Sequence, residues 1–123
     1  MSQGLLGKVY DDGKIIINQE EPGDCMYEIQ EGQVEVFKEK EGKEIQLAVL
    51  GKGDFFGEMA IFDREVRSAT VRAKGEVRAL TIDKRTFLRR ITEDPSLAFR
   101  IVERMSRRIR ELDSEIVRLK IES

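Results

Sequence analysis

The hydrophobic period of the sequence changes once, at Asp83, and this change constrains the fold most. From Lys8 to Asp83, apolar residues alternate with polar ones over short stretches that are separated by glycines, which is typical of antiparallel strands. After Asp83, apolar residues recur every three or four positions, the spacing of one helix face. The pattern predicts a mainly β chain: an antiparallel β-roll or jelly-roll barrel over 1–83, followed by a short and a long α-helix over 84–123.

Within the β part, turn residues separate short stretches of strand-like sequence. A loop, NQEEPGD, follows the first of them, and Glu31-Gly32 is expected to be a hairpin turn because glycine readily adopts a positive φ. The expected strands are KIII, CMYEIQ, QVEVFKE, KEIQLAVL, SATVRA and EVRALTID.

The helical part contains two capping signals and one long apolar seam. Asp83 is expected to cap the short helix and Asp94 the long one, where Pro95 suits the first helical position. The last five apolar positions of the long helix have the mean 3.5-residue spacing of a coiled coil. The whole apolar stripe comprises Leu97, Ile101, Met105, Ile109, Leu112, Ile116 and Leu119.

That stripe has two interpretations. It could pack entirely on the chain's own barrel, or its second half could meet the same helix of another subunit. Because a barrel of this size covers only the first turns of a helix roughly 40 Å long, we expect a homodimer through the long C-terminal helix.

Composition excludes several classes of protein. The chain has 123 residues, 40% of them hydrophobic, which fits one folded domain. No apolar stretch approaches the roughly 18 residues of a membrane helix, and no signal peptide is evident, so no membrane association and a cytoplasmic location are expected. With one cysteine and no histidine, we expect no metal, no cofactor and no enzymatic nucleophile–base pair.

The charge is unevenly distributed. Residues 84–123 carry 11 basic and 7 acidic side chains, although the whole chain has a net charge of −2. A basic tail can bind nucleic acid, but acidic residues interleave with the basic ones along the helix. A solvated helix face is therefore favoured, and no DNA binding is expected from this chain.

The stretch FGEMAIFDREVRSATV, residues 56–71, contains the residues most suited to binding. Gly57 allows close backbone approach, and the turn EMAI has free N–H groups that attract an anion. Arg67 can grip two phosphate oxygens and Ser68 can add a hydroxyl, whereas Glu58 suits a sugar hydroxyl. This chemistry describes a sugar phosphate. On the chemistry alone, however, a surface ion pair between Glu58 and Arg67 is the favoured interpretation, because such pairs are common.

The residues GDFFGEMAIFDREVRSATVRA, Gly53 to Ala73, closely resemble the phosphate-binding cassette of cyclic-nucleotide-binding domains. This is the family of the catabolite activator protein and the regulatory subunits of cAMP-dependent protein kinase. The resemblance extends over PGDCMYEIQEGQVEVF, GKEIQLAVLGKGDFFGE and the long helix, and so covers roughly Lys8 to Leu119.

The resemblance implies a ligand and a role for each cassette residue. The ligand is expected to be cAMP, with cGMP possible. Glu58 resembles the acceptor of the ribose 2′-hydroxyl and Arg67 the arginine that neutralises the cyclic phosphate. The other implied ligand-binding residues are Gly57, Met59 and Ala60 in the turn, Ser68 and Ala69 after the arginine, and Val36 and Leu47 on the apolar wall beside the base.

The long helix is implied to close the site. In the family, residues of this helix cap the base, and the matching positions here are Arg108, Leu112 and Asp113. Asp113 could accept hydrogen bonds from adenine or from guanine. The sequence therefore does not distinguish an adenine ligand from a guanine ligand at this position.

Two other functions are left open by the sequence. The barrel could be a ligand-free dimerisation or protein-interaction module. It could also be a sensor fragment of a larger transcription regulator, since transcription factors of the family continue beyond the position of Ser123 into a helix-turn-helix. In each case the effector protein or domain is unknown.

Overall fold

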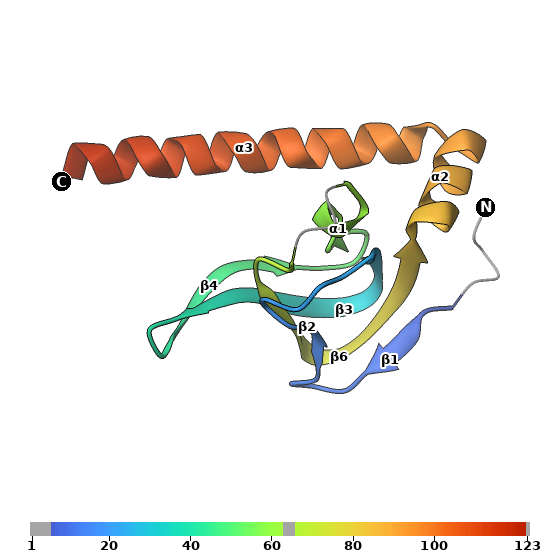
Figure 1. The fold of residues 1–123 in the computed structure, drawn as a ribbon, viewed down its shortest axis with the longest axis horizontal. Helices are drawn as coiled ribbons and strands as arrows, with labels where there is room; N and C mark the ends of the chain where they lie inside the picture. The colour runs from blue at the N-terminus through green and yellow to red at the C-terminus, as the bar shows by residue number, and fades with distance from the viewer. Residues whose placement is uncertain (1–5, 63–65, 123) are drawn as a thin grey trace. The chain divides into compact units, whose positions relative to one another are not determined.

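The computed structural model describes residues 6–62 and 66–122. An antiparallel β part precedes two C-terminal helices, so the predicted fold class is confirmed (Figure 1). The elements are β1 (Lys8–Tyr10), β2 (Ile15–Ile17), β3 (Cys25–Lys40), β4 (Lys43–Leu50), β5 (Phe55–Phe56), α1 (Met59–Phe62), β6 (Thr70–Asp83), α2 (Lys84–Glu93) and α3 (Ser96–Glu122).

The two longest strands, β3 and β6, form the centre of the sheet. They pair from Cys25 opposite Asp83 at one end to Phe37 opposite Thr70 at the other. The second edge of β6 pairs with β1 and β2, and the second edge of β3 pairs with β5 and β4. Each long strand therefore pairs with two shorter strands along its second edge, and segments far apart in sequence join one sheet.

The pairing of β3 with β6 is irregular near its centre, on both sides of Glu31. Two register shifts lie between Ile29 and Gln33. Gly32 has φ +87°, and a Cβ there would lie 2.3 Å from the carbonyl oxygen of Glu76. The predicted hairpin at Glu31-Gly32 is therefore wrong, because β3 continues through it.

A second expectation fails for the same reason. SATVRA and EVRALTID were expected to be separate strands, but β6 runs through Gly75, which has φ +74°. In both long strands the glycine accommodates a bend within a continuous strand.

The hairpin turn of the β part lies instead between β3 and β4. Lys40 pairs with Lys43, and the two residues between them, Glu41 and Gly42, have φ of +54° and +78°. Two-residue loops with both φ values positive match the right-handed twist of the strands they connect. Glu41 is thus a non-glycine residue in a conformation that glycine and asparagine adopt more readily.

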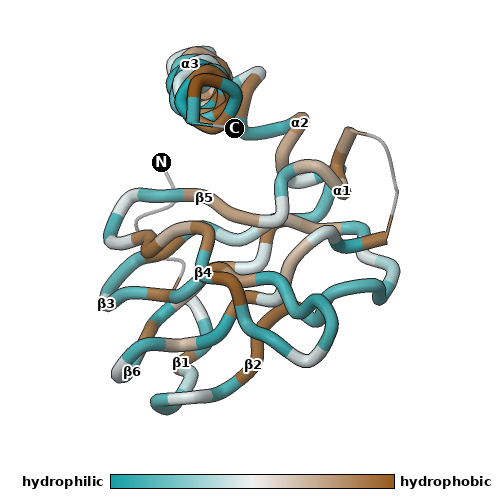
Figure 2. The backbone as a smooth tube through the Cα atoms, turned by 90° about the vertical axis from the view of Figure 1, so that its left-hand side faces the viewer, coloured by the Kyte–Doolittle hydropathy of each residue, from teal (hydrophilic) through white to brown (hydrophobic). Residues whose placement is uncertain are grey.

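The core lies within the β part. Its buried apolar side chains come from β1, β2, β3, β5 and β6, and brown segments recur between teal ones along the tube in Figure 2. Tyr27 and Phe56 add a stacked ring pair, with centroids 5.0 Å apart. The buried cluster comprises Tyr10, Ile17, Ile29, Val34, Phe56, Val71, Ala73, Val77 and Ala79.

The predicted boundary between the helices is confirmed. The main-chain N–H of Ser96 donates to Oδ1 of Asp94 over 3.1 Å, as an N-cap requires. The side chain of Ser96 also donates to Asp94, and these hydrogen bonds hold the pKa of Asp94 below its usual value. α3 then runs as one continuous helix of 27 residues.

The chain forms two compact units, Met1–Arg85 and Thr86–Ser123. Among the residues that the structure describes, no helix is both long and apolar enough to span a membrane.

The turn conformation of Glu41 gives a stability prediction. Glu41→Asn should raise the free energy of unfolding by roughly 0.5–1 kcal/mol, because asparagine tolerates a positive φ better than glutamate does. Glu41→Ala is the matched control, since it removes the same charge without this conformational gain. Urea denaturation measures both, and equal stability of the two variants would contradict the explanation.

Candidate functional site

The candidate site is built where the chain leaves β5 and returns to β6. β5 pairs with Tyr27 and Glu28, and Gly57 and the short helix α1 follow it directly. Residues 63–65, which belong to the predicted cassette, lie outside the described part of the chain. The chain is described again from Val66, which forms a bridge with Pro22.

The guanidinium of Arg67 is the central group of the site. Its side chain comes inward from the cassette, and the residue is only 9% exposed. Nη1 donates to the carbonyl oxygen of Gly57 over 2.8 Å, and Nη2 donates to the carbonyl oxygen of Cys25 over 2.7 Å. Nη2 also lies 3.8 Å from Sγ of Cys25. The fork of the arginine therefore joins the cassette to the start of β3.

Two glycines leave the space that this guanidinium occupies. A Cβ on Gly57 would lie 2.8 Å from Nη1 of Arg67 and 2.9 Å from Cδ1 of Ile17, and Gly57 also has φ +76°. A Cβ on Gly23 would lie 2.2 Å from Nε of Arg67. The sequence indicates that Gly57 leaves room for a ligand, but the structure places Arg67 itself against that Cα.

Among the residues that the structure describes, only dipolar groups contact the charged guanidinium of Arg67, and no carboxylate neutralises it. In the described ranges its hydrogen bonds end on two neutral carbonyls and a thiol, not on Glu58. A guanidinium has five N–H donors, so donors remain for a further acceptor. A buried cation without a countercharge is costly, and an anion bound beside it would lower that cost.

The phenol of Tyr27, a described neighbour, does not supply this countercharge. Tyr27 lies near Cys25 and stacks on Phe56. Burial, and secondarily its hydrogen bond with Cys25, raise the pKa of Tyr27 far above its usual value. The phenol therefore stays neutral at physiological pH.

The other predicted cassette residues lie on either side of Arg67 in the sequence, and they differ in exposure. Glu58 is half-buried and its carbonyl oxygen accepts the N–H of Ile61 over 3.0 Å. The N–H of Ala60, a predicted phosphate donor, donates to the carbonyl oxygen of Gly57 over 3.3 Å. Met59 and Ser68 are exposed and Ala69 is half-buried. Their contacts with a ligand stay predictions.

The two residues predicted for the apolar wall lie on neighbouring strands. Val36 is half-buried on β3, opposite Ala48 and Val71. Leu47 is 38% exposed and lies at a bulge in β4, because Val36 pairs with Ala48 and the next residue, Phe37, pairs with Gln46. Strand pairing thus brings the positions of Val36 and Leu47 together.

The three residues predicted to cap the base lie on α3, in the second unit. Arg108, Leu112 and Asp113 are all exposed. Their place at the site stays a prediction from the resemblance.

Sequence reasoning missed Cys25 and Gly23 as partners of Arg67. Cys25 contributes its carbonyl group, which every residue type has, so the residue type carries no signal. Gly23 belongs to the loop PGD, where a glycine already fits a turn. Nothing in the sequence connects this loop with an arginine over 40 positions away.

Comparison with known proteins identifies the family. The sequence model described as cyclic nucleotide-binding domain matches residues 7–94. The chain belongs to the cyclic nucleotide-binding domain family. Its similarity to relatives extends over nearly all of this cyclic nucleotide-binding domain, including α3.

Three relatives illustrate the range of the family. The cAMP-dependent protein kinase type II regulatory subunit of Drosophila melanogaster is 34% identical over 97% of this chain and 30% of that protein. The crystal structure of Thermus thermophilus catabolite activator protein is 33% identical, with a TM-score of 0.83, over 92% of this chain and 54% of that one. The cGMP-bound EAL enzyme Bd1971 is 35% identical, with a TM-score of 0.66, over 83% of this chain and 28% of that one.

The cyclic nucleotide-binding domain thus spans between about a third and about half of these relatives. It is shared by proteins named as a kinase regulatory subunit, a catabolite activator protein and an EAL enzyme.

The space around Arg67 gives a prediction for Gly57. Gly57→Ala should cost roughly 1–3 kcal/mol of stability more than Gly53→Ala. Both glycines have positive φ, +76° and +88°, but a Cβ at Gly53 meets nothing within 4 Å. Chemical denaturation of the two variants isolates the crowding at Arg67, and equal losses would show that Arg67 does not occupy this space.

Proposed function

We propose that this chain is a regulatory module that binds a cyclic nucleotide in the cassette, with cAMP as the preferred ligand and cGMP as the alternative. The observation that carries the proposal is the arginine at 67. Its guanidinium is nearly buried, is oriented by two carbonyls and lacks a countercharge among the described residues. A cyclic phosphate supplies one compact negative charge with two exocyclic oxygens, which suits the remaining donors.

The other cassette residues give the proposed site its selectivity. Glu58 accepts a hydrogen bond from the ribose 2′-hydroxyl, and Ser68 adds a hydroxyl donor to the phosphate. The turn residues Met59 and Ala60 line the sugar and phosphate. Ala69 contributes a small side chain beside the phosphate contacts of Arg67 and Ser68. Val36 and Leu47 contribute apolar contact at the base.

The base is the least constrained part of the ligand. Arg108, Leu112 and Asp113 would cap it when α3 closes the site, and Asp113 can accept from the amino groups of either purine. The preference for cAMP is supported by the name of the cAMP-dependent kinase subunit, while the cGMP-bound relative keeps cGMP as the alternative.

Calorimetry with cAMP, cGMP and 5′-AMP tests the site. We expect a Kd near the micromolar range for a cyclic nucleotide, about −8 kcal/mol, and much weaker binding of 5′-AMP. Arg67→Lys should weaken the binding about tenfold to a hundredfold, because lysine cannot make the bidentate contact.

Arg78→Lys is the matched control for this experiment. Arg78 also donates to a main-chain carbonyl, that of Gly7 over 2.9 Å, but it lies on the part of β6 that pairs with β1. Its replacement should leave nucleotide affinity unchanged. Unchanged affinity in Arg67→Lys, with intact folding, would refute the site. Absence of any binding by the wild type would favour a ligand-free interaction module.

We further propose that binding is relayed through α3 and that the chain forms a parallel homodimer through this helix. In heptad terms, β-branched Val102, Ile109 and Ile116 occupy the a positions, and Met105, Leu112 and Leu119 occupy the d positions. β-branched residues at a with leucine at d favour parallel two-stranded coiled coils. Ile109, Leu112, Ile116 and Leu119 are 47–60% exposed in the single chain.

The flanking charges agree with this parallel arrangement. Positions g and e of successive heptads meet across a parallel dimer. Here Arg108 at g would face Asp113 at e, and Glu115 at g would face Lys120 at e. Both pairs are of opposite charge.

Sedimentation equilibrium tests the dimer. Replacement of Ile109, Leu112 and Ile116 by glutamine together should convert a dimer into a monomer, because it removes most of the apolar seam. Val117→Gln is the control, since Val117 is 57% exposed on the same helix but lies at a b position. A wild-type chain that sediments as a monomer would contradict the proposed assembly.

A further inference from the structure

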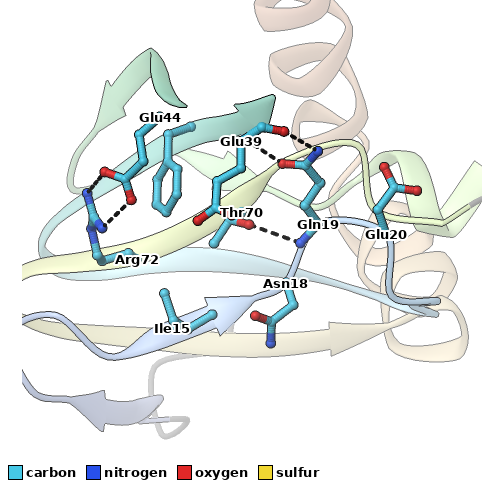
Figure 3. Close-up of a pocket in the computed structure, with 9 residues that line it drawn as sticks. Ile15, Asn18, Gln19, Glu20, Glu39, Glu44, Thr70 and Arg72 are labelled. Atoms are coloured by element: carbon cyan, nitrogen blue, oxygen red, sulfur yellow. Dashed lines mark hydrogen bonds and ion pairs between the residues drawn. The ribbon is translucent and has the colours of Figure 1, made fainter. Parts of the chain in front are cut away.

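A surface cavity of about 480 Å³ lies beside the cassette, within the first unit. Figure 3 shows Gln19 between Glu39 and Thr70 along its wall. The lining residues come from β2, the loop after it, the end of β3, the start of β4 and the start of β6: Ile15, Asn18, Gln19, Glu20, Phe37, Glu39, Glu44, Thr70 and Arg72.

The side chain of Gln19 pairs with the backbone of β3. Its Oε1 accepts the N–H of Glu39 over 2.8 Å, and its Nε2 donates to the carbonyl oxygen of Glu39 over 3.2 Å. These are the two bonds that a neighbouring strand would make at that position. The ladder between β3 and β6 ends two residues earlier, where Phe37 faces Thr70. The side chain of Gln19 therefore makes the hydrogen bonds to β3 that β6 would make if its pairing continued beyond Thr70.

The main chain of Gln19 is attached to the other side of the cavity. Its N–H donates to Oγ1 of Thr70 over 3.0 Å. Thr70 is 8% exposed and is the first residue of β6, three positions after Arg67. Gln19 thus joins the end of β3 to the point where the cassette enters β6.

The next residues hold the main chain of Arg67 directly. The N–H of Glu20 donates to the carbonyl oxygen of Arg67, and the N–H of Arg67 donates to the carbonyl oxygen of Glu21, each over 2.8 Å. Glu20 has φ +72°, an unfavourable conformation for a residue other than glycine. Such a conformation persists only where surrounding contacts impose it. The hydrogen bonds of Gln19, the residue before Glu20, are contacts of this kind.

We propose that Gln19 and Thr70 are positioning residues for Arg67. Together they clamp the segment Gln19–Glu21 in the geometry that holds the Arg67 main chain, so that its guanidinium reaches the carbonyls of Gly57 and Cys25. Neither residue needs to touch the ligand. The inference rests on the proposed function where it concerns nucleotide affinity, and on the hydrogen bonds alone where it concerns the order of Arg67.

Four variants separate this role from a general effect on folding. Thr70→Val removes the acceptor at nearly constant volume, and Thr70→Ser restores a hydroxyl. Gln19→Met keeps the length of the side chain without its two hydrogen bonds. Gln46→Met is the matched control, because Gln46 is an exposed glutamine on β4, opposite Phe37.

Amide hydrogen exchange on the ligand-free chain is the first measurement. Thr70→Val and Gln19→Met should accelerate exchange at Glu20 and Arg67 at least tenfold. Exchange at Ile29, whose N–H donates to the carbonyl oxygen of Asp54 over 2.9 Å, should stay unchanged. Thr70→Ser and Gln46→Met should behave as the wild type. Unchanged exchange at Arg67, or equal acceleration at Ile29, would overturn the proposal.

Calorimetry with cAMP is the second measurement. Thr70→Val and Gln19→Met should bind roughly fivefold to thirtyfold more weakly, and Thr70→Ser within about twofold of the wild type, as expected when an arginine loses its orientation. Equal weakening by Thr70→Ser and Thr70→Val would overturn the proposal. If the wild type binds no nucleotide, the proposed function fails. The exchange data then still show whether Gln19 and Thr70 order the main chain of Arg67.

Discussion

The hydrogen bonds from Arg67 to the carbonyls of Gly57 and Cys25 are the interaction on which the candidate site depends. They orient a buried cation without neutralising it, because carbonyl groups are dipoles and carry no net charge. The arrangement requires a glycine at 57 and at 23, because a Cβ at either position would collide with the Arg67 side chain. A carboxylate in place of either carbonyl would form an ion pair, and the pull on an anionic ligand would weaken.

The sheet makes this interaction possible. Cys25 lies at one end of the β3–β6 pair, opposite Asp83, while Thr70 lies at the other end, opposite Phe37. The chain between β5 and β6 therefore has to span the site, and the loop before Cys25 runs antiparallel to the residues around Arg67. A site residue is thus held from both sides by backbone groups, which is a rigid way to position a long side chain.

The same backbone contacts order the loop that carries the candidate site. Loops are usually more mobile than the elements they join. Here the reciprocal bonds of Arg67 with Glu20 and Glu21, and the contacts of Gln19 with Glu39 and Thr70, extend the sheet into the loop. The family shares this domain among proteins named for different activities, in agreement with the general rule that one fold is found with several functions.

Several features of the fold could be predicted because they depend on neighbouring residues alone. The cap at Asp94 and the start of α3 after Pro95 follow from local sterics and one local hydrogen bond. Glycines 32 and 75 were misinterpreted as separators of strands. A glycine signals a positive φ, but only the pairing partner decides whether the chain reverses or bends there.

The sequence by itself determined the antiparallel β class, the helical ending and the presence of a guanidinium, a carboxylate and a glycine in one short segment. These are properties of period, composition and spacing. Only the tertiary structure decided what holds the guanidinium: the carbonyl of Cys25, the lack of a side chain at Gly23 and the hydrogen bonds of the loop before them. The physical reason is that main-chain carbonyls are the same in every residue, so their use depends on the register of β3 and β6 and not on residue type.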